Sequence, residues 1–152
     1  MPYRHRFCSV VLLALSGCAP APRPVCSDPG NAAEQLWCTT APPESSSEVR
    51  AITTALTSMR ARSAICARLA SIVLQMLLRD RVHLFDAGQY SGAGGLAPIG
   101  LGPGSWMLIS RDVLRSPDLQ MILAHESDHI RGEEHSDSAG TLTPHARQCG
   151  YR

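Results

Sequence analysis

The chain has 152 residues, which is the size of one globular domain rather than two. Apolar residues make up 44% of it and charged residues 18%, so its composition excludes an intrinsically disordered protein. The formal net charge of +1 leaves no basic excess, and we therefore expect no nucleic-acid partner. No apolar run is long enough to cross a bilayer, so hydropathy predicts no membrane-spanning helix.

Residues 1–17 have the features of an export signal. A short basic region at 4–6 precedes an apolar stretch at 7–15. The sequence Leu-Ser-Gly-Cys at 15–18 resembles the lipobox of bacterial lipoproteins. This resemblance implies cleavage before Cys18, lipid chains on Cys18, and anchoring at the bacterial outer membrane or cell surface, including its periplasmic side. The alternative is an ordinary secretory signal followed by a chance Cys.

Residues 18–44 are rich in proline, with six Pro between 19 and 44. Such sequence is extended and semi-rigid, so it predicts a tether between the lipidated Cys18 and the folded domain. Residues 34–38 can form a short helical turn. Trp37 either docks on the domain or stays exposed.

Four Cys remain for disulfide bonding if the signal is removed and Cys18 carries lipid. Four Cys in an exported domain suggest two disulfides, for which three connectivities are possible. We predict a local Cys26–Cys38 link and a long-range Cys66–Cys149 link that ties the tail to the body of the domain. The alternative is that Cys66 is a small buried core residue.

The folded domain is expected over residues 45–152. Three Ser at 45–47 are good N-cap residues, and apolar side chains then recur every three or four positions up to about residue 79. This pattern predicts a long amphipathic helix that covers a small sheet. Its length leaves room for a break between residues 58 and 63.

Two strands are predicted after this helix, at 82–85 and 105–110. The segment 87–104 between them contains seven Gly and no phosphate-binding pattern. It is either a flexible loop beside a cleft or a plain surface loop. Ser116-Pro117-Asp118 then predicts the start of a second helix, which ends at Gly132. These elements together predict an α+β fold.

The residues that carry chemistry lie near the end of the second helix. His125 and His129 are four residues apart, so both imidazoles can face one metal ion. Glu126 is rotated by one helical step and can reach a water at the metal without binding the metal. Gly132 allows the chain to reverse, which can bring His135 back as a third ligand and leave one position open for water.

The pattern His-Glu-x-x-His-x-x-Gly-x-x-His at 125–135 resembles the zinc signature of the metzincin clan of metallopeptidases. The resemblance implies a minimal zincin-like domain in which the three His bind one Zn²⁺ ion and Glu126 is the general base. It also implies that 105–110 is an edge strand that binds an extended peptide or protein substrate. Residues 136–152 contain no Met, so the Met-containing turn of that clan is absent.

Other polar residues near the motif receive lesser roles. Asp128 is expected on the exposed side of the helix. His145 and Tyr151 are expected in a plain tail, although either can stabilise an oxyanion. Asp137 can hydrogen-bond a ligand imidazole. A fourth ligand from His145 or Asp137 would close the site and make it structural.

The sequence as a whole predicts a monomeric zinc metallopeptidase that hydrolyses peptide bonds at the cell envelope. One alternative is a non-catalytic zinc-binding lipoprotein. The other is an interaction module in which the motif is coincidental and its three His side chains diverge.

Overall fold

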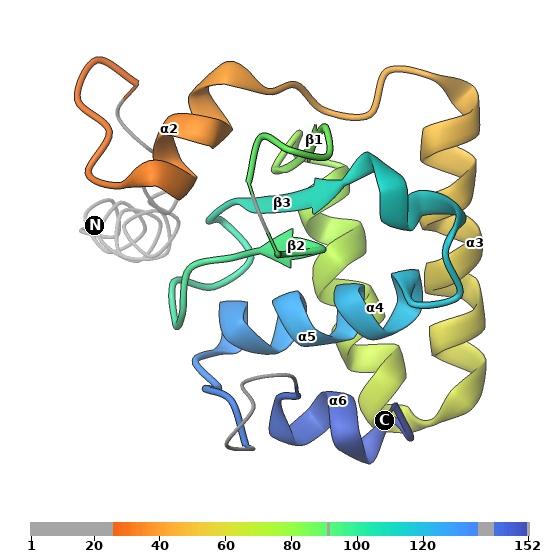
Figure 1. Cartoon of the computed structure of the whole chain (residues 1–152). Coiled ribbons are helices and arrows are strands. Elements are labelled where there is room, and N and C mark those ends of the chain that lie inside the picture. Colours follow the sequence, from red (N-terminus) through yellow and green to blue (C-terminus); the bar gives the residue numbers. More distant parts are fainter. Residues whose placement is uncertain (1–25, 91, 137–141, 152) are drawn as a thin grey trace, which may run out of the picture.

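The structure is a computed structural model that describes residues 26–90, 92–136 and 142–151. It has the predicted α+β fold, with helices packed around a three-stranded sheet (Figure 1). In chain order the elements are α2 (Ala32–Thr39), α3 (Ser46–Arg62), α4 (Ala64–Leu77), β1 (Val82–Phe85), β2 (Gly95–Leu96), β3 (Met107–Ser110), the 3-10 helix η1 (Arg111–Arg115), α5 (Leu119–Arg131) and α6 (Pro144–Gln148). None of the helices in this described part is long and apolar enough to span a membrane.

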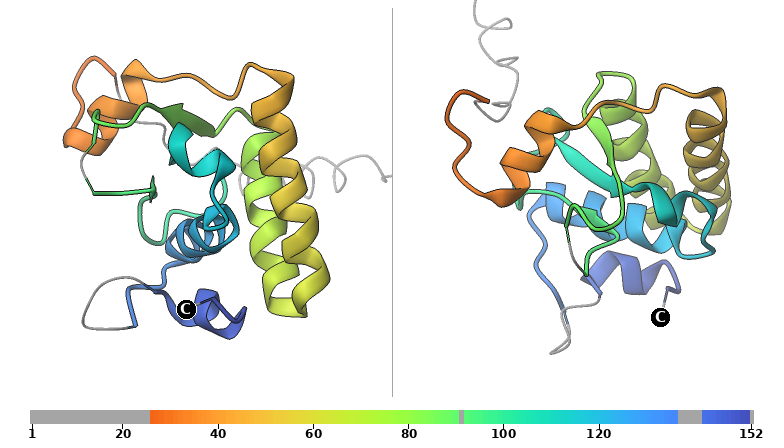
Figure 2. Two further views of the ribbon diagram at one scale, coloured as in Figure 1. Left: turned by 45° about the vertical axis from the view of Figure 1, so that its right-hand side comes forward. Right: turned by 45° about the horizontal axis from the view of Figure 1, so that its top comes forward.

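The helical region predicted from residue 45 to 79 forms two helices, and the break between them at Ser63 lies within the range 58–63 where the expected length left room for one. Ser63 between them has an extended backbone, and its side chain accepts a hydrogen bond from the N–H of Cys66 in the first turn of α4. A Ser in this position starts a new helix, so the apolar repeat continues while the chain reverses. The two helices lie side by side and antiparallel (Figure 2).

The sheet has the order β1-β3-β2, with β1 parallel and β2 antiparallel to β3. The strand predicted at 105–110 is therefore the central strand and not an edge, which corrects the expectation from the metzincin resemblance. The edge strands are β1 and β2, and β2 is a two-residue strand from the Gly-rich segment. Gly95 and Leu96 lack the β-branched and aromatic pattern that marks a strand in sequence.

The strands alternate their side chains between two apolar clusters. Val82, Leu84, Met107 and Ile109 pack with the cluster built by α3, α4 and α5. Phe85 and Leu108 pack in a second cluster with Trp106, Leu36 and Trp37. The second cluster shows that α2 covers the face of the sheet opposite α4 and α5.

Residues 32–39 form helix α2 on the domain, which agrees with the helical turn left open at 34–38 and removes these residues from the extended tether predicted for 18–44. Trp37 is 5% exposed and stacks on His83 with ring centroids 3.5 Å apart. Proline content alone does not reveal this helix, whose side chains of Leu36 and Trp37 are buried against the sheet.

Both predicted disulfides are present, with Cα atoms 5.4 Å apart in Cys26–Cys38 and 5.5 Å apart in Cys66–Cys149. The first links α2 to the segment before it, and the second joins the first turn of α4 to the end of α6. Disulfides persist in oxidising compartments, so both agree with an exported protein. Cys18 and the predicted signal at 1–17 lie outside the described residues.

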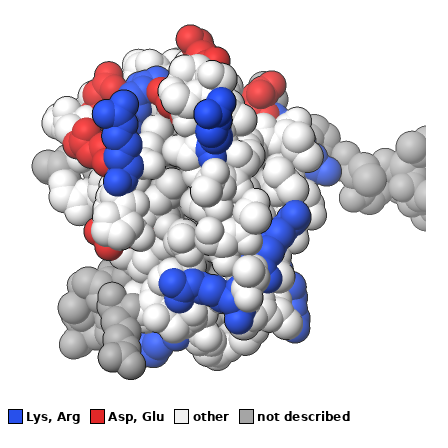
Figure 3. All heavy atoms as spheres, turned by 90° about the vertical axis from the view of Figure 1, so that its right-hand side faces the viewer, with Lys and Arg blue, Asp and Glu red and all other residues white. Residues whose placement is uncertain are grey.

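The face along α3 carries its charges unevenly, and its lower part in Figure 3 shows basic but no acidic side chains among the residues drawn in colour. Arg60 and Arg62 lie in the last turn of α3, where the free carbonyls of a helix favour cations. The Arg62 guanidinium also lies 4.7 Å from the ring centre of Tyr151 and donates to the carbonyl of Cys149. Arg62 thus helps to hold the C-terminal segment against α3.

Candidate metal centre

His125, His129 and His135 come together at the C-terminal half of α5. Nε2 of His125 lies 3.0 Å from Nε2 of His129 and 3.2 Å from Nε2 of His135. Within the described ranges these three residues form the one group of His, Cys, Asp or Glu that can hold a metal ion, with all ligand atoms within 4.8 Å of one another. The fold thus brings together the three residues that the spacing of the motif singles out.

The separations between these nitrogens fit a tetrahedral metal ion. Nitrogen ligands about 2.0–2.1 Å from Zn²⁺ lie about 3.3 Å from one another in tetrahedral geometry. The observed 3.0 and 3.2 Å are close to that value. Imidazole also suits Cu, Fe and Ni, so the donor set supports a transition metal without selecting one.

The turn after α5 returns the chain toward the metal centre. Gly132 has a left-handed backbone with φ 105°, and its N–H donates to the carbonyl of His129. The N–H of Glu133 donates to the carbonyl of Asp128 at 3.1 Å. This pair of hydrogen bonds closes the helix in a Schellman motif, which requires the left-handed residue that glycine supplies.

His129 is held in the tautomer that a metal needs. Its Nδ1 lies 2.7 Å from the carbonyl oxygen of Glu133. A carbonyl can only accept, so Nδ1 carries the proton and Nε2 keeps its lone pair for the metal. Burial lowers the pKa of His129, which further favours the neutral ring.

Glu126 is buried on the flank of α5 that faces β2, and it is 5% exposed. It accepts no hydrogen bond from any described residue, and burial raises its pKa to about 8. Gly95 makes room for it, since a Cβ at that position would lie 2.8 Å from Cγ and 2.9 Å from Oε1 of Glu126. The bare backbone of β2 therefore forms the wall over this carboxylate.

The Gly-rich segment continues along α5 to the end of the helix. The N–H of Gly100 donates to the carbonyl of His129 at 2.8 Å, and the N–H of Gly102 donates to that of Ile130 at 2.9 Å. These carbonyls lie in the last turn, where a helix lacks internal donors. The segment that the sequence left undecided is thus hydrogen-bonded to the helix that carries His125 and His129 and is not a plain surface loop.

Asp128 is fully buried, at 0% exposure, so the prediction of an exposed position is wrong. Its carboxylate oxygens accept hydrogen bonds from the backbone N–H of His145 at 2.9 Å and from Nδ1 of His145 at 2.8 Å. The sequence offers no signal for this pair, because its members are 17 residues apart and on different helices. Packing of α6 against α5 brings them together.

The other candidate residues of the tail do not join the three His. His145 is absent from the metal-binding group of the described residues, and Asp137 lies outside those residues. Tyr151 donates a hydrogen bond to Gln120 at 3.3 Å, near the opposite end of α5. The structure therefore supplies no fourth protein ligand from the residues it describes.

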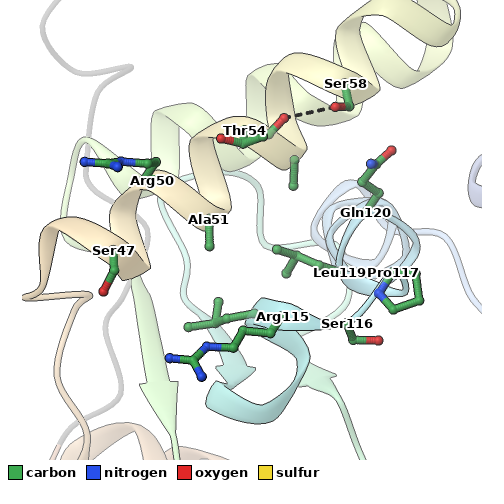
Figure 4. Close-up of a pocket in the computed structure, with 12 residues that line it drawn as sticks. Ser47, Arg50, Ala51, Thr54, Ser58, Arg115, Ser116, Pro117, Leu119 and Gln120 are labelled. Atoms are coloured by element: carbon green, nitrogen blue, oxygen red, sulfur yellow. Dashed lines mark hydrogen bonds between the residues drawn. The ribbon is translucent and has the colours of Figure 1, made fainter.

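A groove of about 520 Å³ lies between α3 and the segment from η1 to the start of α5 (Figure 4). Leu119 points into it, and Ala51 and Ala55 line its α3 side. Its lining contains no His, Cys, Asp or Glu. The groove is thus at the other end of α5 from the three His. The candidate functional site is therefore the His cluster and not the groove.

No model of a known protein family matches this chain, and neither does any curated protein or solved structure. The structure itself defines a small disulfide-linked α+β domain with a candidate metal centre of three His. The function must be inferred from that centre.

Proposed function

We propose that the protein is a zinc-dependent peptidase of the cell envelope. His125, His129 and His135 hold one Zn²⁺ ion, and Glu126 is the general base. The observation that carries this proposal is a buried carboxylate on the helix that supplies two of the three converging imidazoles. Catalytic zinc sites have three protein ligands and an open position, whereas structural sites are closed by a fourth.

The reaction is hydrolysis of a peptide bond. When bound, Zn²⁺ supplies a water of lowered pKa and polarises the carbonyl of the substrate. Glu126 takes a proton from the attacking water as its oxygen bonds to the carbonyl carbon. Glu126 then passes the proton to the nitrogen as the C–N bond breaks, which yields a carboxylic acid and an amine.

The proposed substrate is an extended peptide or protein segment. In the described part of the sheet, β2 pairs with β3 on one side and has no strand on the other. A peptide added to this free edge would gain main-chain hydrogen bonds and pass close to Glu126. The substrate-binding strand proposed here is therefore Gly95–Leu96, in place of residues 105–110.

Lipid on Cys18 would keep this activity close to a membrane surface. Cys26 lies eight residues after Cys18 and is joined by a disulfide to Cys38 of α2. Eight residues span at most about 28 Å when fully extended. The docking of α2 therefore makes the tether short, and membrane-bound or envelope proteins are the substrates within reach of a monomeric enzyme.

The test compares the wild-type chain with Glu126→Gln, both exported, oxidised and loaded with Zn²⁺. Each is incubated with a peptide library, and cleavage is read by mass spectrometry. Cuts made only by the wild type at equal zinc content would support the proposal. Equal cleavage by both proteins would contradict the role of Glu126.

Absence of cleavage by either protein calls for a titration with a small hydroxamate, which binds zinc only where a position is open. Binding with retention of zinc would keep the peptidase proposal and point to a narrow substrate. Failure to bind would favour the alternative of a non-catalytic zinc-binding lipoprotein.

A further inference from the structure

The third ligand of the candidate centre is held differently from the other two. His125 and His129 belong to α5, but His135 follows the helix and is exposed. A ligand outside the helix contributes fully only if the chain on both sides of it is held in place, because ordering a loose segment costs binding free energy.

On the N-terminal side of His135, the turn at Glu133 holds the chain. The N–H of Glu133 donates to the carbonyl of Asp128, and its carbonyl accepts the hydrogen bond from Nδ1 of His129. On the C-terminal side, the N–H and Oγ of Ser136 donate to the carbonyl of Leu142 at 2.8 and 3.0 Å. The hydrogen bonds of Ser136 therefore restrain the chain after His135 only if Leu142 is itself held in place.

Leu142 is placed by α6, which begins two residues later. The start of α6 is fastened to α5 by the two hydrogen bonds from His145 to the Asp128 carboxylate. Hydrogen bonds to a charged acceptor are stronger than neutral ones, and a site at 0% exposure admits little competition from water. The far end of α6 is joined to α4 through Cys66–Cys149.

We propose that Asp128 and His145 are positioning residues of the metal centre. They fasten α6 to α5 and thereby hold the chain that carries His135, so they decide whether the centre binds metal with three ligands or with two. This inference rests on the proposed binding of metal by the three His. Neither residue is proposed to touch the metal or the substrate.

The test uses Co²⁺ as the probe, because its visible absorption reports the number and geometry of its ligands. Asp128→Asn keeps the size of the side chain but removes its charge, so the two charge-assisted hydrogen bonds to His145 are replaced by neutral ones, and the imidazole must change tautomer to accept from the amide. We expect its affinity for Co²⁺ to fall about 10–100-fold, as for other residues that orient ligands indirectly. We also expect the Co²⁺ spectrum to change toward that of His135→Ala.

A double-mutant cycle separates positioning from general destabilisation. If Asp128 acts through His135, then Asp128→Asn combined with His135→Ala binds Co²⁺ as weakly as His135→Ala alone. Additive losses would overturn the inference. Ser127→Ala is the matched control, since Ser127 is equally buried but its Oγ bonds only to the carbonyl of Ala124 within α5. Its Co²⁺ affinity should match the wild type.

His145→Ala is the milder variant if Asp128→Asn does not fold. It keeps the backbone N–H bond to Asp128 and should weaken Co²⁺ binding less, about 3–10-fold. His125→Ala separates the two levels of the proposal. If His125→Ala retains Co²⁺, the metal centre itself is wrong. If it loses Co²⁺ while Asp128→Asn and His145→Ala bind normally, only the positioning role is wrong.

Discussion

Two carboxylates lie two residues apart on α5, and the fold gives them opposite surroundings. Glu126 faces the bare backbone of β2, has no hydrogen-bond partner among the described residues, and has its pKa raised to about 8 by burial. Asp128 lies on the other flank of α5, at 0% exposure, and accepts two hydrogen bonds from His145.

Under the proposed function, the difference between the two flanks separates a reactive carboxylate, Glu126, from a structural one, Asp128. A buried carboxylate without partners is unfavourable for folding, and proteins retain such groups mainly where chemistry needs them. A buried carboxylate with its acceptor sites filled instead fastens one element to another. The neighbours packed on each flank, a glycine strand and the start of a helix, therefore decide what each acid does.

The largest expected effect comes from Glu126→Gln. The amide keeps the shape of the side chain but cannot take a proton from water, so peptide cleavage should fall about 10²–10⁴-fold. The affinity for Zn²⁺ should stay within about threefold of the wild type, because Glu126 is not a ligand. Steady-state cleavage and chelator competition measure the two quantities. A large loss of zinc affinity would contradict the assignment of Glu126 as a residue that does not bind the metal.

Gly95→Ala tests the wall over Glu126. Its Cβ would lie under 3.0 Å from Cγ and Oε1 of Glu126 and from Cγ2 of Ile122, so the carboxylate must move. We expect about 1–3 kcal/mol of lost stability and about a tenfold loss of cleavage by the folded fraction. Gly94→Ala is the control, because its Cβ would meet Ile122 and Val113 but not Glu126. Unaltered cleavage by Gly95→Ala would show that the backbone of β2 does not position Glu126 for cleavage.

Asp128→Ala tests the opposite flank of α5 by measuring how much the Asp128 carboxylate contributes to the stability of the fold. Removing the carboxylate leaves two donors of His145 without their acceptor, which should lower the free energy of unfolding by about 1–3 kcal/mol. Urea denaturation of the oxidised, metal-free protein measures this quantity. An effect below that of Ser127→Ala would show that the hydrogen bonds of Asp128 contribute little to the fold.

Glu48 is a third carboxylate, away from both flanks of α5, and Glu48→Gln tests its contribution to stability. The backbone N–H of Ser45, followed by the Arg111 guanidinium, lowers the pKa of Glu48 to about 2 from 4.5. Its stabilisation is therefore complete above about pH 4.5 and disappears as the pH falls through about 2. We expect the variant to be about 1 kcal/mol less stable at pH 7, with the difference shrinking below about pH 4.5 and becoming small only below about pH 2. A constant difference across this range would contradict the assignment.

Much of the centre was predictable because its signals are local. Residues four apart share a helical face, so His125 and His129 were paired without any tertiary information. Gly132 marked the end of α5 because a left-handed residue there favours glycine. The same local chemistry operates at Ser63, inside the range 58–63 where a break was left open, because a Ser N-cap within an apolar repeat divides the predicted helix into α3 and α4.

The amino-acid sequence by itself determined the α+β class, the metal-binding pattern and the cysteines available for two disulfides. Capping, periodicity and residue type act over a few positions and can be interpreted along the chain. Only the tertiary structure decided that β2 is the edge over Glu126, that α2 covers the sheet, and that Asp128 fastens α6. Each of these depends on contacts between segments distant in sequence, where burial and partner geometry outweigh local propensity.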